Sequence, residues 1–448
     1  MRTVLLLLAL GGASAVAGAA RPPLIEAVKG GDREAVRALL QQKADVNATE
    51  PDGTTALHWA SYRDDVESVG LLIRAGATVN AANDLGATPL WIASENGSVS
   101  LVKALLQAGA DPNLALLLGE TPLMVASRSG KAEVAGQLLL AGANVDARAA
   151  RGQTALMWAV SQRHPEVVRV LLANGADVHR RSDVWSQVMA VPPHGVALYN
   201  KVIPHGGETA LLFAARSGDV DSAKLLLAAG ANVNDADAWG VSAAVLAAHS
   251  GFGELLAFLL ERGADPNAAA AGFTALHAAI MQRSLAMATT LLARGADPNA
   301  PLKTWTPTRR SSKDFNFAPE LVGATPFWLA ARFSQPDVMR LLLKHGADGK
   351  VVHHGHYHNE EPVEPRSHVT NAVMAATGIG GGVAWVQPDR REREALMLDA
   401  VTLAVEQGAD VNAADTDGRT ALDAARALKF ERVAAFLIEH GGRTGTKR

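Results

Sequence analysis

Several features that would assign a protein to a functional class are missing from this sequence. It contains no cysteine, which excludes disulfide bonds, thiol catalysis and cysteine-based zinc sites. An excess of charge of one sign is also missing, because 42 lysine and arginine residues face 45 aspartate and glutamate residues. Aromatic residues make up only 5% of the chain, and no basic stripe is interleaved with them. The composition therefore argues against a nucleic-acid partner.

The first twenty residues differ in composition from the rest of the chain. A positive start at Arg2 leads into an apolar run from Val4 to Leu10, and small residues follow up to Ala20. This order predicts a cleaved secretory signal at residues 1–20. A membrane anchor is the alternative, but the run is short and glycine-rich for a span, and no cysteine follows it for lipid attachment. We therefore expect a periplasmic or secreted protein without membrane contact after cleavage.

A six-residue phrase recurs along the chain at a spacing of 33 residues. Its first copy reads Thr-Ala-Leu-His-Trp-Ala and its second Thr-Pro-Leu-Trp-Ile-Ala. The copies of the regular series begin at Thr55, Thr88, Thr121 and Thr154. A fixed period of this size is typical of a stack of similar small units that share one continuous core. The repeat therefore predicts a solenoid and not a set of separate globular domains.

Each unit carries signals for two short helices. In the unit of Thr88, Gly86 opens the repeat, the threonine can cap the first helix, and Pro89 suits its first turn. The second helix ends in two leucines, and Gly109 then provides a left-handed stop before the turn to the next unit. Helices of about ten residues do not persist alone in water. The fold therefore needs the stack to bury each apolar stripe.

The threonine phrase and the Gly-Ala-Asp-x-Asn turn, repeated at this period, resemble the ankyrin repeat. The resemblance implies an all-α repeat solenoid of stacked helix-turn-helix units with short β-hairpin-like fingers at residues 21–442, followed by a polar tail at 443–448. It also implies structural roles for His58 and His277, which would bond between neighbouring loops. Eleven units begin at Leu24, Thr55, Thr88, Thr121, Thr154, Thr209, Ser242, Thr274, Thr325, Thr370 and Thr420.

Four insertions interrupt the period in the second half of the chain. Three follow the turn glycines Gly175, Gly295 and Gly346, and should extend fingers on one side of the stack. The fourth should connect the two helices of its unit at the opposite end. Insertions on one face of a solenoid usually mark its working face. The inserted segments are 180–206, 301–322, 350–369 and 379–391.

Two sets of exposed side chains are expected on this working face. Large aromatic residues in the fingers, such as Trp185, Trp305 and Phe317, either pin the fingers to the groove, which we favour, or wait for a partner. The residues after each phrase should face the groove by resemblance, and their mixture of arginine, aromatic and polar types suits protein recognition. This predicted partner-binding set is Tyr62, Arg63, Glu95, Asn96, Arg128, Gln162, Arg216, His249, Gln282, Arg332 and Phe333.

The third finger contains a histidine-rich stretch. His354, His356 and His358 alternate, so in an extended chain they point to one face at intervals of about 6.6 Å. Such a pattern can bind zinc, copper or nickel, with Glu360, Glu361 or His368 completing the ligand shell. A solvated histidine-rich loop is the favoured interpretation, and a pH-sensing cluster is a third one.

No catalytic motif is recognisable. The sequence contains no nucleophile elbow and no His-Glu-x-x-His motif. The run from Gly378 to Gly382 lacks the Gly-Lys-Ser/Thr ending of a phosphate loop, so we interpret it as a flexible connector. The leading hypothesis is a non-enzymatic scaffold without a cofactor that binds a partner protein through its concave face and long fingers. The alternative is a metal-binding or metal-dependent site in finger 350–369. No oligomeric state is specified.

Overall fold

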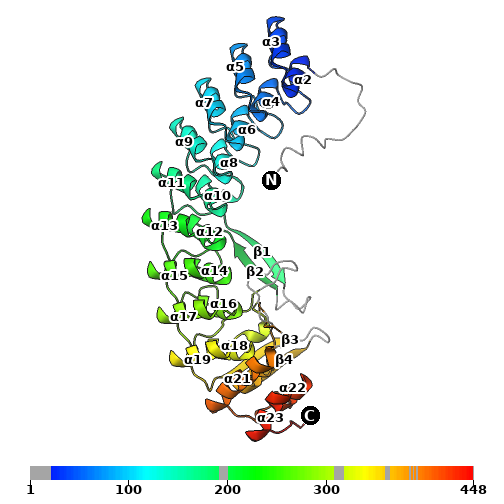
Figure 1. Cartoon of the computed structure of the whole chain (residues 1–448), viewed down its shortest axis with the longest axis vertical. Coiled ribbons are helices and arrows are strands. Elements are labelled where there is room, and N and C mark those ends of the chain that lie inside the picture. Colours follow the sequence, from blue (N-terminus) through cyan, green and yellow to red (C-terminus); the bar gives the residue numbers. More distant parts are fainter. Residues whose placement is uncertain are drawn as a thin grey trace, which may run out of the picture. The chain divides into compact units, whose positions relative to one another are not determined.

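A computed structural model describes residues 22–190, 200–306, 317–358, 364–382, 385–386, 388–389 and 392–446 (Figure 1). The predicted signal at residues 1–20 lies outside them. The described residues form eleven pairs of antiparallel helices, one for each unit expected from the sequence. Contacts divide the chain into unit 1, Met1–Ala150 with Ala173–Ala176, and unit 2, Arg151–Leu172 with Asp177–Arg448.

Unit 1 contains four regular helix pairs. Within this unit, each first helix packs against the first helix of the next pair, and each second helix packs against the next second helix. The pairs are α2 (Pro23–Gly30) with α3 (Arg33–Gln41), α4 (Ala56–Tyr62) with α5 (Val66–Arg74), α6 (Pro89–Asn96) with α7 (Val99–Gln107), and α8 (Pro122–Arg128) with α9 (Ala132–Leu140).

The remaining seven pairs lie mainly in unit 2. They are α10 (Ala155–Ser161) with α11 (Pro165–Ala173), α12 (Ala210–Ser217) with α13 (Val220–Ala228), α14 (Ala243–His249) with α15 (Gly253–Glu261), α16 (Ala275–Met281) with α17 (Leu285–Ala293), α18 (Pro326–Arg332) with α19 (Pro336–Lys344), α20 (Ala372–Ala376) with α21 (Arg393–Glu406), and α22 (Ala421–Ala427) with α23 (Glu431–Glu439). Two 3-10 turns, η1 (Ala150–Gly152) and η3 (Pro319–Leu321), complete the helical elements described.

Threonine side chains begin most of the first helices, as the sequence predicts. Thr55, Thr88 and Thr121 each accept a hydrogen bond from the backbone N–H three residues further on. In the tenth repeat the cap is not Thr370 but Asn371, the last residue of a β-strand, which accepts a hydrogen bond from the backbone N–H of Met374. The side-chain cap therefore moves by one residue where an inserted hairpin runs directly into the helix.

The two helices of a repeat differ in burial. In α6 every residue from Pro89 to Ser94 is buried, whereas α7 buries only Leu101, Val102 and Leu105. The first helix is sandwiched between neighbouring first helices and its own partner, so it has no free apolar stripe. The core of each unit is therefore a continuous row of first helices covered by the inner face of the second ones.

His58 links neighbouring repeats, as the resemblance implies. Its Nδ1 lies 2.8 Å from Thr55 Oγ1, and its Nε2 lies 2.9 Å from the carbonyl oxygen of Ala87 in the next repeat. His277 makes the same contact with its own cap, Thr274, at 2.8 Å. Its Nε2, however, has no hydrogen-bond partner among the described residues. A hydrogen bond thus confirms the link between loops for His58. Burial lowers the pKa of His277, and backbone contacts with Ala300 and Ala324, which oppose this shift, place its ring between the equivalent loops.

Asparagine side chains form a ladder along the turns between repeats. Asn47 donates to the carbonyl oxygen of Gly76 at 3.2 Å and accepts from the backbone N–H of Thr78 at 2.8 Å. Asn299 makes the same pair of bonds, with Gly346 at 2.9 Å and Asp348 at 2.8 Å, although a long insertion separates them. The further rungs described start from Asn80, Asn113, Asn234, Asn267 and Asn412.

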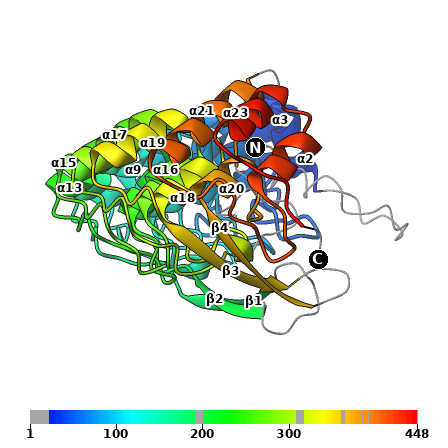
Figure 2. The same ribbon diagram turned by 90° about the horizontal axis from the view of Figure 1, so that it is seen from below.

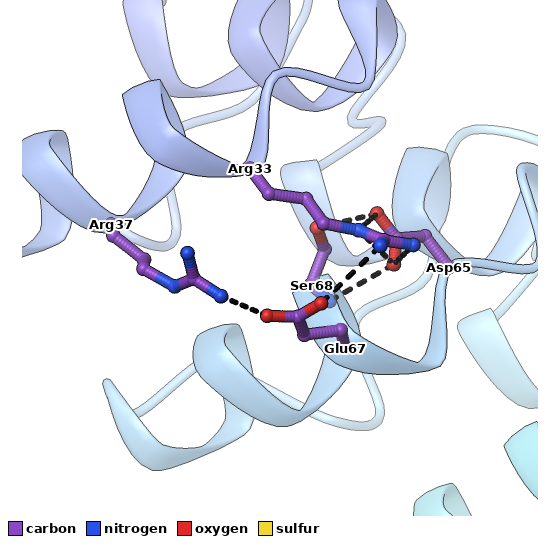
Figure 3. A network of polar contacts seen from close by, with 5 residues as sticks. All are labelled: Arg33, Arg37, Asp65, Glu67 and Ser68. Atoms are coloured by element: carbon purple, nitrogen blue, oxygen red, sulfur yellow. Dashed lines mark hydrogen bonds and ion pairs between the residues drawn. The ribbon is translucent and has the colours of Figure 1, made fainter.

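A charged cluster joins the first two second helices of unit 1 (Figure 3). Arg33 lies 2.8 Å from Asp65 and 3.3 Å from Glu67, and Arg37 also binds Glu67. Asp65 caps α5 and accepts the hydroxyl proton of Ser68 at 2.7 Å. Burial opposes ionisation of Asp65, but the hydrogen bonds from Arg33 and Ser68 outweigh it and keep its pKa below the usual value.

The last residues described are bound to the final repeat. Arg443 N–H donates to Asn412, and the Arg443 carbonyl accepts from Thr420 Oγ1, both at 2.8 Å. Gly445 N–H donates to Asp423 at 2.8 Å. The segment expected as a polar tail at 443–448 therefore continues the hydrogen-bonding pattern of the repeats as far as residue 446.

Two of the three predicted fingers form antiparallel hairpins. β1 (Trp185–Ala190) pairs with β2 (Asn200–His205), and β3 (Val352–His358) pairs with β4 (Pro365–Asn371). Both hairpins leave unit 2 on the same side, next to the first helices (Figures 1 and 2). The architecture is a helical repeat solenoid with short strand pairs, which confirms the predicted fold class.

Candidate binding surface

In unit 1, three of the predicted binding residues are exposed at the ends of first helices. Tyr62 is 41% exposed, and Arg63 and Asn96 are exposed as well. Arg63 donates to the carbonyl oxygen of Lys29 at 2.9 Å, and Asn96 donates to those of Ser61 and Tyr62 at 3.1 Å. Arg63 and Asn96 thus satisfy helix-terminal carbonyls of the preceding repeat, which fixes where their side chains lie on the surface.

The other two predicted residues of unit 1 belong to a half-buried ionic group. Arg128 lies 2.9 Å from Glu120 and 3.8 Å from Glu95. Burial raises the pKa of both carboxyl groups, while the charge of Arg128 opposes the rise. The single guanidinium of Arg128 is therefore shared by two partly desolvated carboxyl groups beside the end of α8.

In unit 2 the predicted residues differ in exposure. Gln162 and Arg216 are exposed, and Arg216 forms an ion pair with Glu208. His249 and Gln282 are half-buried, and the Gln282 amide donates to the backbone carbonyl of His249. In unit 2 the ends of the first helices thus carry exposed polar side chains beside others that are bonded to a neighbouring repeat.

Arg332 and Phe333 are packed within the protein and contact their neighbours. Arg332 donates from Nε to the carbonyl of Gly381 at 2.8 Å and from Nη2 to that of Gly382 at 3.0 Å. Burial lowers the pKa of Arg332 to about 10, with Glu320 opposing the shift. Phe333 is only 6% exposed and lies under the Arg332 guanidinium. These two side chains hold the fourth insertion and present little surface of their own.

The glycine run of the fourth insertion is packed closely. Gly380 has a φ of +114°, and a Cβ atom there would lie 2.6 Å from the Trp328 ring. At Gly381 a Cβ atom would lie 2.7 Å from Glu320. The run does connect α20 with α21, as predicted, but these glycines are required by close approach and not only by flexibility.

The expected location of the fourth insertion, at the end opposite the fingers, is wrong. Trp385 of this insertion lies 5.2 Å from Phe317 of the second finger and 5.0 Å from His249 at the end of α14, between ring centroids. The positive φ values in the glycine run let the backbone turn back toward the fingers. All four insertions therefore contribute to one side of unit 2.

The three fingers converge. Lys201 of β2 lies 4.3 Å above the Trp305 ring of the second finger and also donates to Thr304 Oγ1. Trp305 is 9% exposed and Phe317 is fully buried, which confirms the pinning role expected for these aromatic residues. A pocket of about 570 Å³ lies between the fingers, lined by Lys201, Trp305, Pro319, Val322, His356, Tyr357, His358, Pro365, Arg366 and Ser367.

The histidine-rich stretch is a strand, so its alternate residues do share one face. His354 and His356 are exposed and His358 is half-buried. Glu360 and Glu361, considered as further ligands, lie outside the described residues. Within the described ranges, no three histidine, aspartate or glutamate side chains are grouped so that they could hold a metal ion. The metal site on His354, His356 and His358 stays a prediction.

His353 and His368 form a buried pair on the opposite face of the same hairpin. Their ring nitrogens are 3.2 Å apart, and His353 Nε2 lies 3.0 Å from the carbonyl oxygen of Val322. Burial lowers the pKa of His353, and burial together with His353 lowers the pKa of His368 to about 4. His368 is therefore directed to His353 and is not a ligand candidate alongside His354.

Comparison with known proteins agrees with the geometry. The fold and the finger-lined face define a helical repeat solenoid with an extended surface. Family models for ankyrin repeats in three copies match residues 24–116, 90–182 and 211–301, one for many copies matches 156–227, and one for a single repeat matches 322–353. The chain therefore belongs to the ankyrin-repeat family, whose members are generally protein–protein interaction modules and typically non-enzymatic.

Among solved structures, the ankyrin repeat domain of human ASB11 is similar in sequence. The two chains are 29% identical over 55% of this chain and 100% of that domain, with a TM-score of 0.46. In the described part of the chain, no helix combines the length and apolarity needed to span a membrane.

Proposed function

We propose that this chain is a non-enzymatic scaffold that binds a partner protein with the finger side of unit 2. An exposed valine pair on the first hairpin carries the proposal. Val188 and Val202 are cross-strand partners and are 64% and 65% exposed, and Val184 just before β1 is 61% exposed. Contact of these large apolar side chains with water is unfavourable, and burying them in an interface lowers the free energy of the system. Gln162, exposed at the end of α10 in the same unit, supplies a further polar contact.

Affinity capture with the hairpin altered tests this proposal. We expect the wild-type chain to retain a defined protein that Val188→Ser/Val202→Ser retains at least tenfold less, because loss of two buried valines costs about 3 kcal/mol. Leu140→Ser is the matched control, since Leu140 is 81% exposed on α9 of unit 1, which carries none of the fingers. Equal capture by the hairpin variant and wild type would place the interface elsewhere.

The partner is expected outside the cytoplasm. The charged start, apolar run and small residues at positions 1–20 support export to the periplasm or beyond. Mass spectrometry of the protein purified from its native cells should find a mature amino terminus close to Arg21. A chain that retains its first twenty residues in the cytoplasm would contradict the proposed location.

A second candidate is a surface metal site on β3, favoured by the exposure of His354 and His356 on one face. Purified protein should then contain stoichiometric zinc, copper or nickel, and His354→Ala/His356→Ala should lose it. His345→Ala, an exposed histidine after α19, is the control. Metal-free protein with full thermal stability would exclude this candidate.

A further inference from the structure

A second pocket, of about 390 Å³, lies at the foot of the first hairpin. Its walls come from three elements of unit 2. The inward face of the hairpin contributes Trp185 and His205, which are cross-strand partners with rings stacked 4.3 Å apart. Helix α12 contributes Phe213, and the turn before α14 contributes Asp237 and Trp239. Aromatic walls with a few polar groups are typical of a ligand site.

The two guanidinium groups of this pocket already have contacts. Arg151 lies over the Trp185 ring at 5.0 Å, and Arg216 forms an ion pair with Glu208. Asp237 is different, because its Oδ1 accepts the backbone N–H groups of Trp239 at 2.9 Å and Val241 at 2.8 Å, within its own turn. Its second oxygen has no hydrogen-bond or ion-pair partner among the described residues. A half-buried carboxylate oxygen in the pocket wall thus makes no direct contact with a cation, and Arg216 acts on Asp237 only through its charge.

The same turn is found at two further places in the described part of the chain, and they show what is unusual here. Asn83 accepts the N–H groups of Leu85 and Ala87, so the turn itself needs only one acceptor atom. Asp415 accepts the N–H groups of Asp417 and Arg419 with Oδ1, and its other oxygen lies 2.7 Å from the Arg419 guanidinium. Where the last repeat has this arginine, four residues after the aspartate, the pocket has Val241.

We infer that this pocket binds an ammonium or guanidinium group carried on an apolar stem. The cation would meet the free oxygen of Asp237, with Glu208 nearby, and the stem would lie between the rings of Trp185, Trp239 and Phe213. Aromatic rings attract a cation, and a charge-assisted hydrogen bond to a partly desolvated carboxylate is stronger than a neutral one. The lining carries three carboxylates, Asp183, Glu208 and Asp237, against the two guanidinium groups of Arg151 and Arg216, so its balance of charge favours a cation.

The protonation of Asp237 agrees with this assignment. Burial raises the pKa of Asp237 and the charge of Glu208 adds to the rise, while the hydrogen bonds from its own turn and the charge of Arg216 oppose it. A bound cation would remove the cost of ionising Asp237. A lysine or arginine of the partner protein is one source of such a group, in which case the pocket deepens the function proposed above. A free diamine is the other source.

Calorimetry with small probes on the full chain tests the pocket. We expect N-acetyl-lysine methylamide and cadaverine to bind, and uncharged N-acetyl-norleucine methylamide to bind at least tenfold more weakly. Asp237→Asn should weaken the two cations by about tenfold or more, in the range of a lost charge-assisted hydrogen bond. The occurrence of Asn83 in an equivalent turn shows that an amide is compatible with this geometry. Asp415→Asn, the same change in the last repeat, should leave binding unchanged.

Three results would overturn the assignment: no binding of either cation at about 10 mM, equal binding of the norleucine compound, or unchanged affinity in Asp237→Asn. If the lysine compound binds more tightly than cadaverine, the pocket recognises a protein side chain, and the reverse order indicates a free amine. Because no partner protein is used, a negative result here leaves the capture experiment unaffected.

Discussion

The regular repeats of unit 1 and the interrupted repeats of unit 2 are built from the same helix pair. The threonine caps, buried first helices and asparagine rungs recur in both. They differ on the finger side. In unit 1 the Ala87 carbonyl accepts the backbone N–H of Asn83 and also lies 2.9 Å from the His58 ring, whereas in unit 2 the equivalent carbonyl of Ala324 accepts the N–H of Leu302 from the inserted finger. An insertion thus keeps this backbone bond of the turn and adds a surface there.

The largest expected effect comes from the glycine run of unit 2. Gly380→Ala should destabilise this unit by about 2–5 kcal/mol, because it combines a left-handed alanine with a clash against Trp328. Gly378→Ala is the matched control: its φ is +97°, but nothing lies within 4 Å of the new Cβ, so only the backbone cost of about 1–2 kcal/mol applies. Urea unfolding measures both. Equal losses would mean that Trp328 moves aside.

The next largest effect is expected from acid, which should destabilise unit 2 more than unit 1. His58 is the buried histidine of unit 1, and burial lowers its pKa. Unit 2 buries His277, His353 and His368, and burial lowers the pKa of His277 and His368 to about 4. A histidine with a depressed folded-state pKa stabilises the fold fully above its unfolded value of 6.5 and loses this contribution as pH falls toward 4.

Each such histidine lowers the free energy of unfolding by about 1.4 kcal/mol for every pH unit of acidification in that window. Hydrogen exchange, corrected for intrinsic rates, should therefore show unit 2 losing protection at a higher pH than unit 1. His368→Gln, which removes one titrating ring, should narrow the difference. Parallel loss of protection in both units would show that the buried histidines do not govern acid unfolding.

The smallest effect is expected at the contact between fingers. Lys201→Ala removes the cation from the Trp305 ring and should weaken the protection of β2 by about 0.5–1 kcal/mol, the usual strength of an exposed cation–π contact. Lys303→Ala provides the control, since this lysine is exposed in the same finger as Trp305. Hydrogen exchange of β2 distinguishes the two variants. No change in Lys201→Ala would mean that the fingers are held together by other contacts.

The sequence predicts the repetitive part of this molecule well, because period, caps and turn glycines act over a few residues. The eleven helix pairs and the same-side fingers follow from it. The contacts within the insertions do not, since Lys201 and Thr304 meet although they are 103 positions apart in the sequence. The buried face of β3 was missed for another reason: alternation places three histidines together but does not say which face is outward. One local signal was available, the missing arginine four residues after Asp237.

Asn299 has a consequence for how this chain can vary. It bonds Gly346 and Asp348 with the geometry that Asn47 uses for Gly76 and Thr78, although the second finger intervenes. The rung therefore encloses the second finger together with the helix pair α18 and α19, and it still has the geometry of a regular repeat. The turn-to-turn register of the stack is thus independent of the length of the finger, so a change in finger length need not propagate into the repeats that follow.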